Sequence, residues 1–129
     1  MLDQCSAEIA SVLKTYIQPG GLPSLVHCSH GKDRTGLVVA LVLMVLGVPL
    51  NAIDKDYRLS DGALDSERAE RIIELRTLGF DESGLYTSPK MISTMQKHLD
   101  EKYGGIDAYL DGIGFSKEDR TRMRELILY

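Results

Sequence analysis

Hydrophobic residues recur along the chain at a helical spacing that changes near residue 24. Between residues 2 and 17 they fall three or four positions apart, as in Ile9, Leu13 and Ile17, which predicts an amphipathic helix. The stretch 19–23, rich in Pro and Gly, ends that helix. Residues 24–28 (SLVHC) predict a short strand, because a β-branched residue lies between two turn-forming segments. Residues 34–46 predict a second helix, which Gly47 ends.

The predicted helix at 34–46 is apolar on nearly every side. No polar residue interrupts the run from Leu37 to Leu46, so we expect this helix to be buried and not half-exposed. The remaining chain is predicted to be helical at 50–59, 65–78, 88–102, 106–110 and 117–128. Ser116 and Asp119 predict a capping box at the start of the last of these helices.

A single strand cannot satisfy its own backbone N–H and C=O groups, and a helix as apolar as 34–46 needs a sheet to cover. We therefore expect an α/β fold, in which helices flank a central sheet that this chain leaves incomplete. Residues 1–129 would then be the C-terminal portion of a single domain, with a loop at 27–36 and a helical remainder at 50–129. The missing strands would precede Met1 or come from another molecule, so self-association is a second expectation.

Composition and charge exclude several classes of function. The chain has 129 residues and a net charge of −4, so it lacks the basic field that nucleic-acid binding requires. Its two cysteines are too few for a disulfide framework and lie outside any metal-ligand spacing, so we expect neither a metal nor another cofactor. The N-terminus shows no secretory pattern, and the longest apolar run is too short to span a bilayer. These features favour the reducing cytoplasm, where a free thiol survives.

The segment 27–36 (HCSHGKDRTG) carries the candidate chemistry. Cys28 ends the predicted strand and Arg34 opens the predicted helix, so the loop between them must turn sharply, as Gly31 permits. Such a loop points successive backbone N–H groups inward and places a helix N-terminus beside them, which favours an anion. Arg34 adds a planar fork that can bind two phosphate oxygens.

The same positive surroundings should ionise Cys28. A thiol at a helix N-terminus beside a guanidinium loses its proton well below the free value of about 8.5, and the thiolate is a strong nucleophile. Thr35 could donate its hydroxyl to the sulfur when the sulfur becomes a leaving group. The alternative, a buried core thiol, would leave the accompanying Lys32, Arg34 and Thr35 unexplained, whereas for Cys5 simple packing is the better interpretation.

The segment HCSHGKDRTG resembles the active-site loop of the protein tyrosine phosphatase superfamily, in the branch of bacterial and fungal tyrosine/serine phosphatases. The similarity extends to 52–61 (AIDKDYRLSD) and to 103–128 near the C-terminus. It implies a phosphomonoester hydrolase that acts through a phosphocysteine intermediate on phosphotyrosine, with phosphoserine, phosphothreonine and phosphoinositides as further candidates. Its partners would be phosphorylated proteins or phosphoinositides.

The resemblance also implies roles for individual residues. Cys28, Arg34, Asp33 and Thr35 would be catalytic. The substrate-binding residues would be Ser29, His30, Gly31, Lys32, Asp33 and Arg34. Lys32 and His30 would widen the positive rim, and Asp33 is a candidate general acid, although it could instead orient Lys32 or Arg34. Asp3, the one aspartate before Cys28, is not expected to serve as the acid.

Two other functions remain open from the residues alone. A rhodanese-like sulfurtransferase also uses a loop between a cysteine and an arginine, but the run Gly-Lys-Asp-Arg-Thr-Gly fits it poorly. A truncated or inactive phosphatase-like domain would bind phosphorylated partners without hydrolysing them. Retention of Cys28 and Arg34 argues against an inactive domain, whereas the missing upstream part of the domain argues that this chain by itself is inactive.

Overall fold

The computed structural model describes residues 1–128, and every regular element within that range is helical. In chain order the elements are α1 (Ser6–Ile17), α2 (Asp33–Val45), α3 (Leu50–Ala63), η1 (Asp65–Glu67), α4 (Arg68–Thr77), η2 (Glu82–Leu85), α5 (Met91–His98), η3 (Leu99–Tyr103), α6 (Ile106–Gly112) and α7 (Lys117–Leu128). η1 and η2 are 3-10 turns, whereas η3 is a π-helical continuation of α5. No helix in this range is long and apolar enough to cross a membrane.

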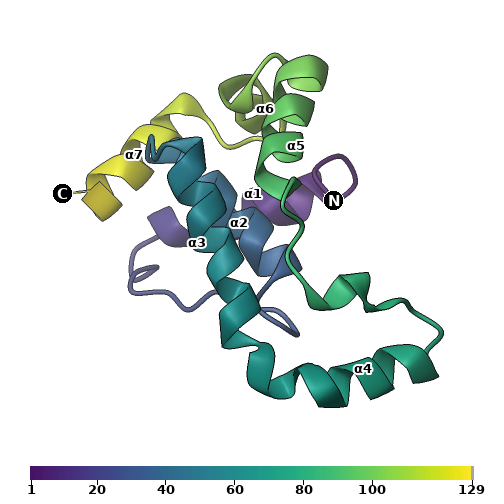
Figure 1. Ribbon diagram of the computed structural model, residues 1–129. Coiled ribbons are helices and arrows are strands. Elements are labelled where there is room, and N and C mark those ends of the chain that lie inside the picture. The colour runs from purple at the N-terminus through teal and green to yellow at the C-terminus, as the bar shows by residue number, and fades with distance from the viewer. Residues whose placement is uncertain (129) are drawn as a thin grey trace.

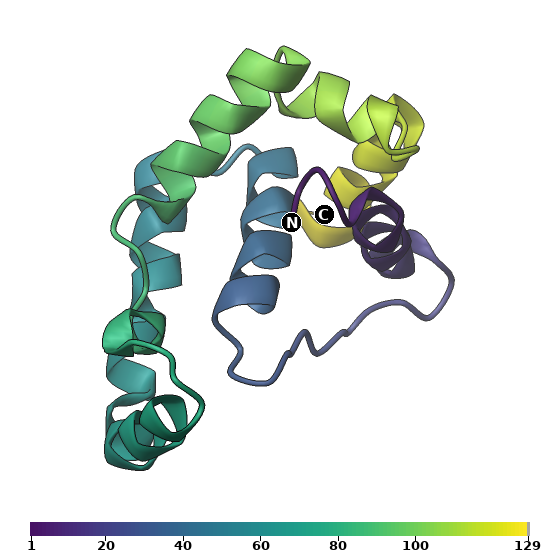
Figure 2. The same ribbon diagram turned by 90° about the vertical axis from the view of Figure 1, so that its right-hand side faces the viewer.

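The strand predicted at 24–28 is wrong for the described part of the chain. These residues belong to an extended loop that runs from the end of α1 to the start of α2 (Figures 1 and 2). An extended segment becomes a strand only when a neighbour accepts and donates its backbone hydrogen bonds, and none of residues 1–128 does so; Leu25 is 89% exposed. Of the expected α/β fold, residues 1–128 therefore display the helices but not the sheet.

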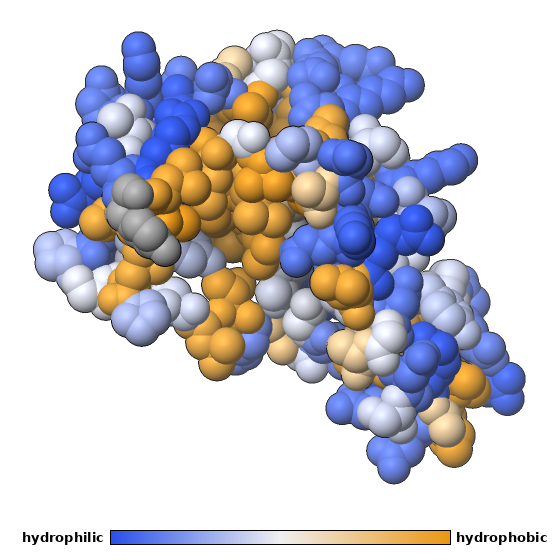
Figure 3. Space-filling model, turned by 60° about the vertical axis from the view of Figure 1, so that its left-hand side comes forward, coloured by the Kyte–Doolittle hydropathy of each residue, from blue (hydrophilic) through white to orange (hydrophobic). Residues whose placement is uncertain are grey.

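Helix α2 lies at the centre of the helical assembly, in contact with α1, α3 and α7. Its buried face carries Leu37, Ala40, Leu41 and Val45. Burying each large side chain of this kind stabilises the fold by roughly 1.5–3 kcal/mol. The expectation that α2 is buried all round is wrong, because several of its other apolar side chains, Val38 among them, are only partly covered. Figure 3 shows a broad apolar area on one face of the molecule.

Helix α7 contacts the C-terminal ends of both α1 and α2. Its predicted capping box is confirmed: the Ser116 amide donates to Asp119 Oδ2 at 2.9 Å, and the Asp119 amide donates to Ser116 Oγ at 3.2 Å. Further along α7, the Nε atoms of Arg122 and Arg124 donate to the carbonyl oxygens of the last residues of α1 and α2, at 2.9 and 2.7 Å. These carbonyls have no partner within their own helices, and a cation there also complements the helix dipole.

The N-terminal turn is attached to the α5–η3 region through Asp3. Its carboxylate pairs with Lys102 Nζ at 2.8 Å, accepts from Tyr103 Oη at 2.5 Å and contacts His98 Nε2 at 2.9 Å. The bonds from Lys102, Tyr103 and His98 hold the Asp3 pKa far below its ordinary value. These contacts attach the N-terminal turn to α5 and η3.

Residues 64–86, which we call the arm, leave the helical assembly after α3 and return before α5 (Figures 1 and 2). The arm contains η1, α4 and η2, and none of its α4 residues is buried. Its two ends are joined at Asp61 and Thr87, which share two hydrogen bonds. Arg68 reinforces the junction, because its guanidinium lies 4.4 Å from the centre of the Tyr86 ring and donates to the Asp61 carbonyl at 3.1 Å.

Candidate active site

The 27–36 loop turns at Gly31 and runs directly into α2. Gly31 has φ +64°, a left-handed conformation that a side chain would strain, and the helix begins two residues later at Asp33. The loop therefore delivers its backbone amides and the N-terminal end of a 13-residue helix to one place. The sequence predicts a strand, a loop and a helix in succession, and the described residues contain the loop and the helix but not the strand.

Cys28 is half-buried within this turn. Burial alone would raise its pKa, but hydrogen bonds from the Thr35 hydroxyl and from the amides of Thr35, Gly31 and Lys32 outweigh it and lower the pKa to about 7. The Thr35 hydroxyl is itself buried and has no hydrogen-bond partner within residues 1–128, so it is available to the Cys28 sulfur, whose pKa it lowers. Near neutral pH a substantial fraction of Cys28 is thus thiolate.

Arg34 lies on the first turn of α2 and lines the same hollow as Cys28, but the groups that lower the Cys28 pKa are Thr35, Gly31 and Lys32 and not the expected guanidinium. Its Nη2 donates to Ser29 Oγ at 2.9 Å, which joins the two ends of the loop. Arg34, Ser29 and Cys28 line one open hollow of about 550 Å³, together with Thr35 and with apolar side chains from α1 and α2. Because Arg34 is exposed, most of its five N–H donors remain free to meet an anion in that hollow.

Lys32 does not line an open rim. The residue is only 3% exposed, and its ammonium donates to Asp33 Oδ1 at 2.8 Å and to the Tyr86 carbonyl at 3.3 Å. Its backbone amide, in contrast, faces the Cys28 sulfur. The side chain of Asp33 is 62% exposed and therefore reachable from solvent, and His30 is exposed on the loop.

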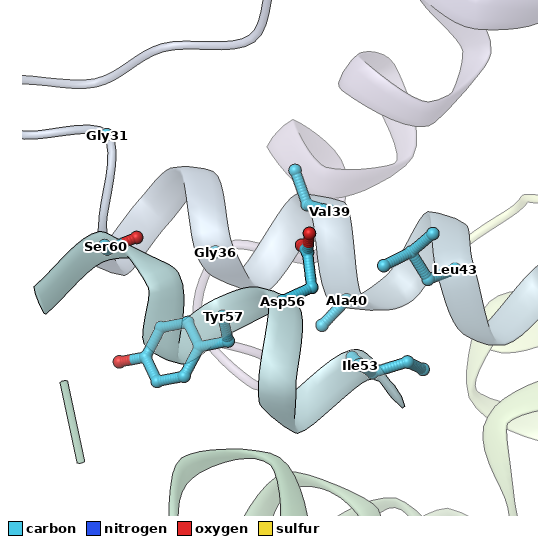
Figure 4. A pocket seen from close by; sticks show the side chains of 9 residues that line it. All are labelled: Gly31, Gly36, Val39, Ala40, Leu43, Ile53, Asp56, Tyr57 and Ser60. Carbon is cyan, nitrogen blue, oxygen red and sulfur yellow. The ribbon is translucent and has the colours of Figure 1, made fainter. Parts of the chain in front are cut away.

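Helix α3 supports the loop from behind. The Tyr57 ring packs against Gly36 so closely that a Cβ atom there would lie 2.9 Å from two ring carbons. Figure 4 shows this seam between α2 and α3, whose small space of about 70 Å³ is lined on the α3 side by Ile53, Tyr57 and neighbouring residues. Neither Cys28 nor Arg34 lines that space, so we assign it to helix packing and not to substrate.

The structure brings to the site three residues that the sequence analysis did not select. Tyr57 and Asp61 lie four positions apart on α3 and so share a helix face, which is the one signal available in the sequence. Thr87 reaches Asp61 only because the arm returns to α3. Among residues 1–128 no three His, Cys, Asp or Glu side chains gather closely enough to bind a metal ion.

A half-buried, acidified thiol encircled by inward amides at a helix start defines an anion site with a built-in nucleophile. The chain belongs to the tyrosine phosphatase family, whose model matches residues 1–129. The resemblance seen in the 27–36 loop is thereby confirmed at the level of the family. Membership also favours phosphatase chemistry over the sulfurtransferase alternative.

Several curated proteins are similar to this chain. The "Triple specificity protein phosphatase PtpB" of Mycobacterium tuberculosis is 31% identical over 123 residues, covering 84% of this chain and 45% of that protein. A tyrosine-protein phosphatase of Nostoc commune is 30% identical over 110 residues, covering 78% of this chain and 37% of the relative. The putative tyrosine-protein phosphatase OCA1 of Eremothecium gossypii is 26% identical over 105 residues, with 78% and 45% covered. The chain thus spans less than half the length of these relatives.

Proposed function

We propose that this chain carries the nucleophile and phosphate-binding loop of a cysteine-dependent phosphatase that hydrolyses phosphomonoesters. The observation that supports it most is the position of Cys28 in a turn at Gly31 that runs directly into the start of α2, where loop amides face the sulfur and lower its pKa to about 7. The same amides that stabilise a thiolate would stabilise the oxygens of a transferring phosphoryl group. Arg34, exposed beside the thiol, would bind two of those oxygens in a bidentate manner.

In the first step of the proposed reaction, the Cys28 thiolate attacks phosphorus. A sulfur–phosphorus bond forms as the bond to the leaving oxygen breaks, and that oxygen takes a proton from a general acid. Asp33 is our candidate for the acid within this chain, since its carboxyl group is exposed next to the loop. Its contact with Lys32 at 2.8 Å equally supports the alternative, in which Asp33 orients that lysine.

In the second step, water attacks the phosphocysteine and gives a proton back to the group that served as general acid, Asp33 in our assignment. The phosphorus–sulfur bond breaks, inorganic phosphate leaves, and the electron pair returns to the sulfur as thiolate. The buried Thr35 hydroxyl would stabilise the leaving sulfur, because it has no competing partner within residues 1–128. In both steps negative charge lies on the phosphoryl oxygens or on the Cys28 sulfur, which the loop amides and Thr35 would stabilise.

We propose phosphotyrosine as the principal substrate, since the hollow beside Cys28 is wide, open and bordered by apolar side chains such as Val12 and Val38. An aromatic leaving group would bury apolar surface there. Phosphoserine, phosphothreonine and phosphoinositides are further candidates, in line with the name of the Mycobacterium tuberculosis relative, a triple specificity protein phosphatase. A cytoplasmic location belongs to the same proposal, because the mechanism needs a reduced thiol.

Hydrolysis of an aryl phosphate by the full chain tests this function. Cys28→Ser should abolish turnover while it preserves phosphate binding, because a serine hydroxyl is rarely ionised near neutral pH. Arg34→Lys should lower kcat by a factor of roughly 100 or more, since an ammonium cannot replace a bidentate donor in the transition state. Cys5→Ser is the matched control and should leave turnover unchanged.

Full activity of the Cys28→Ser chain would refute the proposal. A second candidate function is a phosphate-binding domain without catalysis. It applies if the parent chain binds phosphate but does not hydrolyse the ester. The absence of a sheet from residues 1–128 is the observation that favours this second function.

We also propose that residues 1–129 form the C-terminal portion of a single phosphatase domain. The unpaired extended segment at 24–28 and the partly covered side of α2 support this view, as does the limited share of each relative that the chain spans. Strands from elsewhere would pair with the segment at 24–28 and cover the exposed side of α2.

A further inference from the structure

The 27–36 loop is held from behind by residues far along the chain. The side chain of Lys32, a residue of this loop, is buried. Its ammonium has two partners, and one of them is the Tyr86 carbonyl at 3.3 Å, which lies 54 residues further along the chain. A buried ammonium is costly unless it is paired and hydrogen-bonded. Its other partner, Asp33, is an exposed neighbour on the same helix start, so the Tyr86 carbonyl is the contact that ties Lys32 to a separate part of the fold.

The Tyr86–Thr87 segment is in turn held by Asp61. The Thr87 amide donates to Asp61 Oδ1 at 2.7 Å, and the Thr87 hydroxyl donates to Asp61 Oδ2 at 2.6 Å. Thr87 is buried, and both carboxylate oxygens are used, so this is a two-point attachment with charge-assisted bonds. Desolvation raises the Asp61 pKa, but the two bonds from Thr87 and the nearby Arg68 lower it on balance, so the group is a carboxylate at neutral pH.

A third contact ties the same segment to the other end of the loop. The Ser88 backbone faces the Tyr57 hydroxyl and lowers its pKa, although burial raises that pKa on balance, and the Tyr57 ring packs against Gly36. Residues 86–88 thus reach the loop both through Lys32 and through Tyr57. Asp61 is the side chain that joins these residues to α3 by two hydrogen bonds.

We propose that Asp61 is a positioning residue for the 27–36 loop: through Thr87 and the Tyr86 carbonyl it fixes Lys32, whose backbone amide faces the Cys28 sulfur. The inference rests on the proposed function, because it assigns Asp61 a role in preparing the nucleophile. Asp61 itself touches neither the sulfur nor a reacting atom. Without its carboxylate, the segment 86–87 loses its attachment, the ammonium of Lys32 loses a fixed acceptor, and the Lys32 amide loses its direction.

The pH dependence of Cys28 alkylation by iodoacetamide tests this role in the full chain with Cys5→Ser, so that one thiol reports. Asp61→Ala should move the midpoint upward and slow alkylation at about pH 6 by roughly two- to fourfold, the loss of thiolate being partly offset by its higher nucleophilicity. Alanine is the best helix former, so α3 itself is not weakened.

Two control variants separate positioning from general damage. Asp61→Asn should keep the parental midpoint, because its amide oxygen can accept from the Thr87 amide while its NH2 group donates to the Thr87 hydroxyl. Asp54→Ala, on the same helix, removes only a 4.0 Å ion pair with Arg58 and should change nothing. An unchanged midpoint in folded Asp61→Ala would overturn the inference.

A double substitution shows whether Asp61 acts through Lys32. Lys32→Met should raise the midpoint by itself, and adding Asp61→Ala should then have no further effect, whereas additive shifts would contradict the proposed route. Should Asp61→Ala fail to fold, Thr87→Val and Thr87→Ser replace it. The valine variant loses the hydroxyl donor and should raise the midpoint, and the serine variant retains it; equal midpoints would overturn the inference.

The same titration distinguishes failure of the proposed nucleophile from failure of the positioning role of Asp61. A parental midpoint equal to that of the unfolded chain would mean that the proposed nucleophile fails, and the role of Asp61 with it. A low parental midpoint that Asp61→Ala leaves in place would refute the positioning role alone.

Discussion

The acidity of Cys28 predicts that the folded chain is alkylated faster than the unfolded chain at low pH and more slowly at high pH. The perturbation is unfolding of the chain in guanidinium chloride, with Cys5→Ser so that the signal comes from Cys28. In the folded chain the Cys28 pKa is about 7, held there against burial by the Thr35 hydroxyl and three backbone amides. In the unfolded chain the thiol should return to about 8.5.

The expected ratio of rates follows from these two values. Near pH 6 a thiol with a pKa of about 7 is roughly 9% thiolate, and one of about 8.5 is roughly 0.3%, a difference of about thirtyfold. The less basic thiolate is intrinsically less nucleophilic, by about fivefold for this difference in pKa. Alkylation of the folded chain should therefore be about six times faster near pH 6 and about five times slower above pH 9.5, where both thiols are ionised.

Rates of iodoacetamide consumption across pH measure the ratio of folded to unfolded rates both near pH 6 and above pH 9.5. Mass spectrometry confirms that Cys28 is the alkylated site. Inorganic phosphate should slow alkylation of the folded chain alone, since only the folded loop directs amides toward an anion. Folded and unfolded chains with the same midpoint would show that the inward amides do not acidify Cys28. A folded chain that is slower at every pH would show that access, not ionisation, governs the rate.

Three further predictions concern stability and association. Gly36→Ala should lower the free energy of unfolding by about 1–3 kcal/mol in urea melts, because its Cβ would meet the Tyr57 ring at 2.9 Å. Gly62→Ala, in the last turn of α3 with no atom nearby, should instead stabilise by about 0.5–1 kcal/mol, and equal effects would contradict this account. Ser116→Ala should cost about 1 kcal/mol by removing half of the capping box, and Ser116→Asp should restore it. Val12→Lys, at a 38% exposed position beside the hollow, should weaken self-association by about tenfold in sedimentation experiments, whereas a parental chain that stays monomeric at all concentrations would refute this face as an interface.

The helices could be predicted from the sequence because their signals are local. The last helix, at 117–128, has the predicted bounds, since a capping box starts it. The helix predicted at 88–102 begins only at Met91, after Pro89, whose ring disfavours helical geometry in the residue before it. It also widens into a π-helix at Leu99, a change for which the apolar spacing carries no signal.

The strand at 24–28 could not be decided from its own residues. The pattern SLVHC favours a strand, but a strand is a relation between two segments, and no segment of residues 1–128 pairs with this one. The loop could be predicted for the opposite reason: Cys28, Gly31 and Thr35 lie within eight positions and act through one turn and one helix start. Asp61 and Thr87 stayed hidden, because their contact depends on the path by which the arm returns.

The uncovered side of α2 and the candidate site are parts of the same surface. Val38 of α2 and Val12 of α1 line the hollow that contains Cys28 and Arg34, and they also border an adjoining apolar groove of about 290 Å³. Any element that covers these valines therefore forms a wall of the hollow as well. It would exclude water from the guanidinium and the thiolate, and charge interactions strengthen as water is removed. Covering this face and preparing the loop for chemistry are thus one structural requirement, and the same contact should raise both the stability of the chain and its rate of hydrolysis.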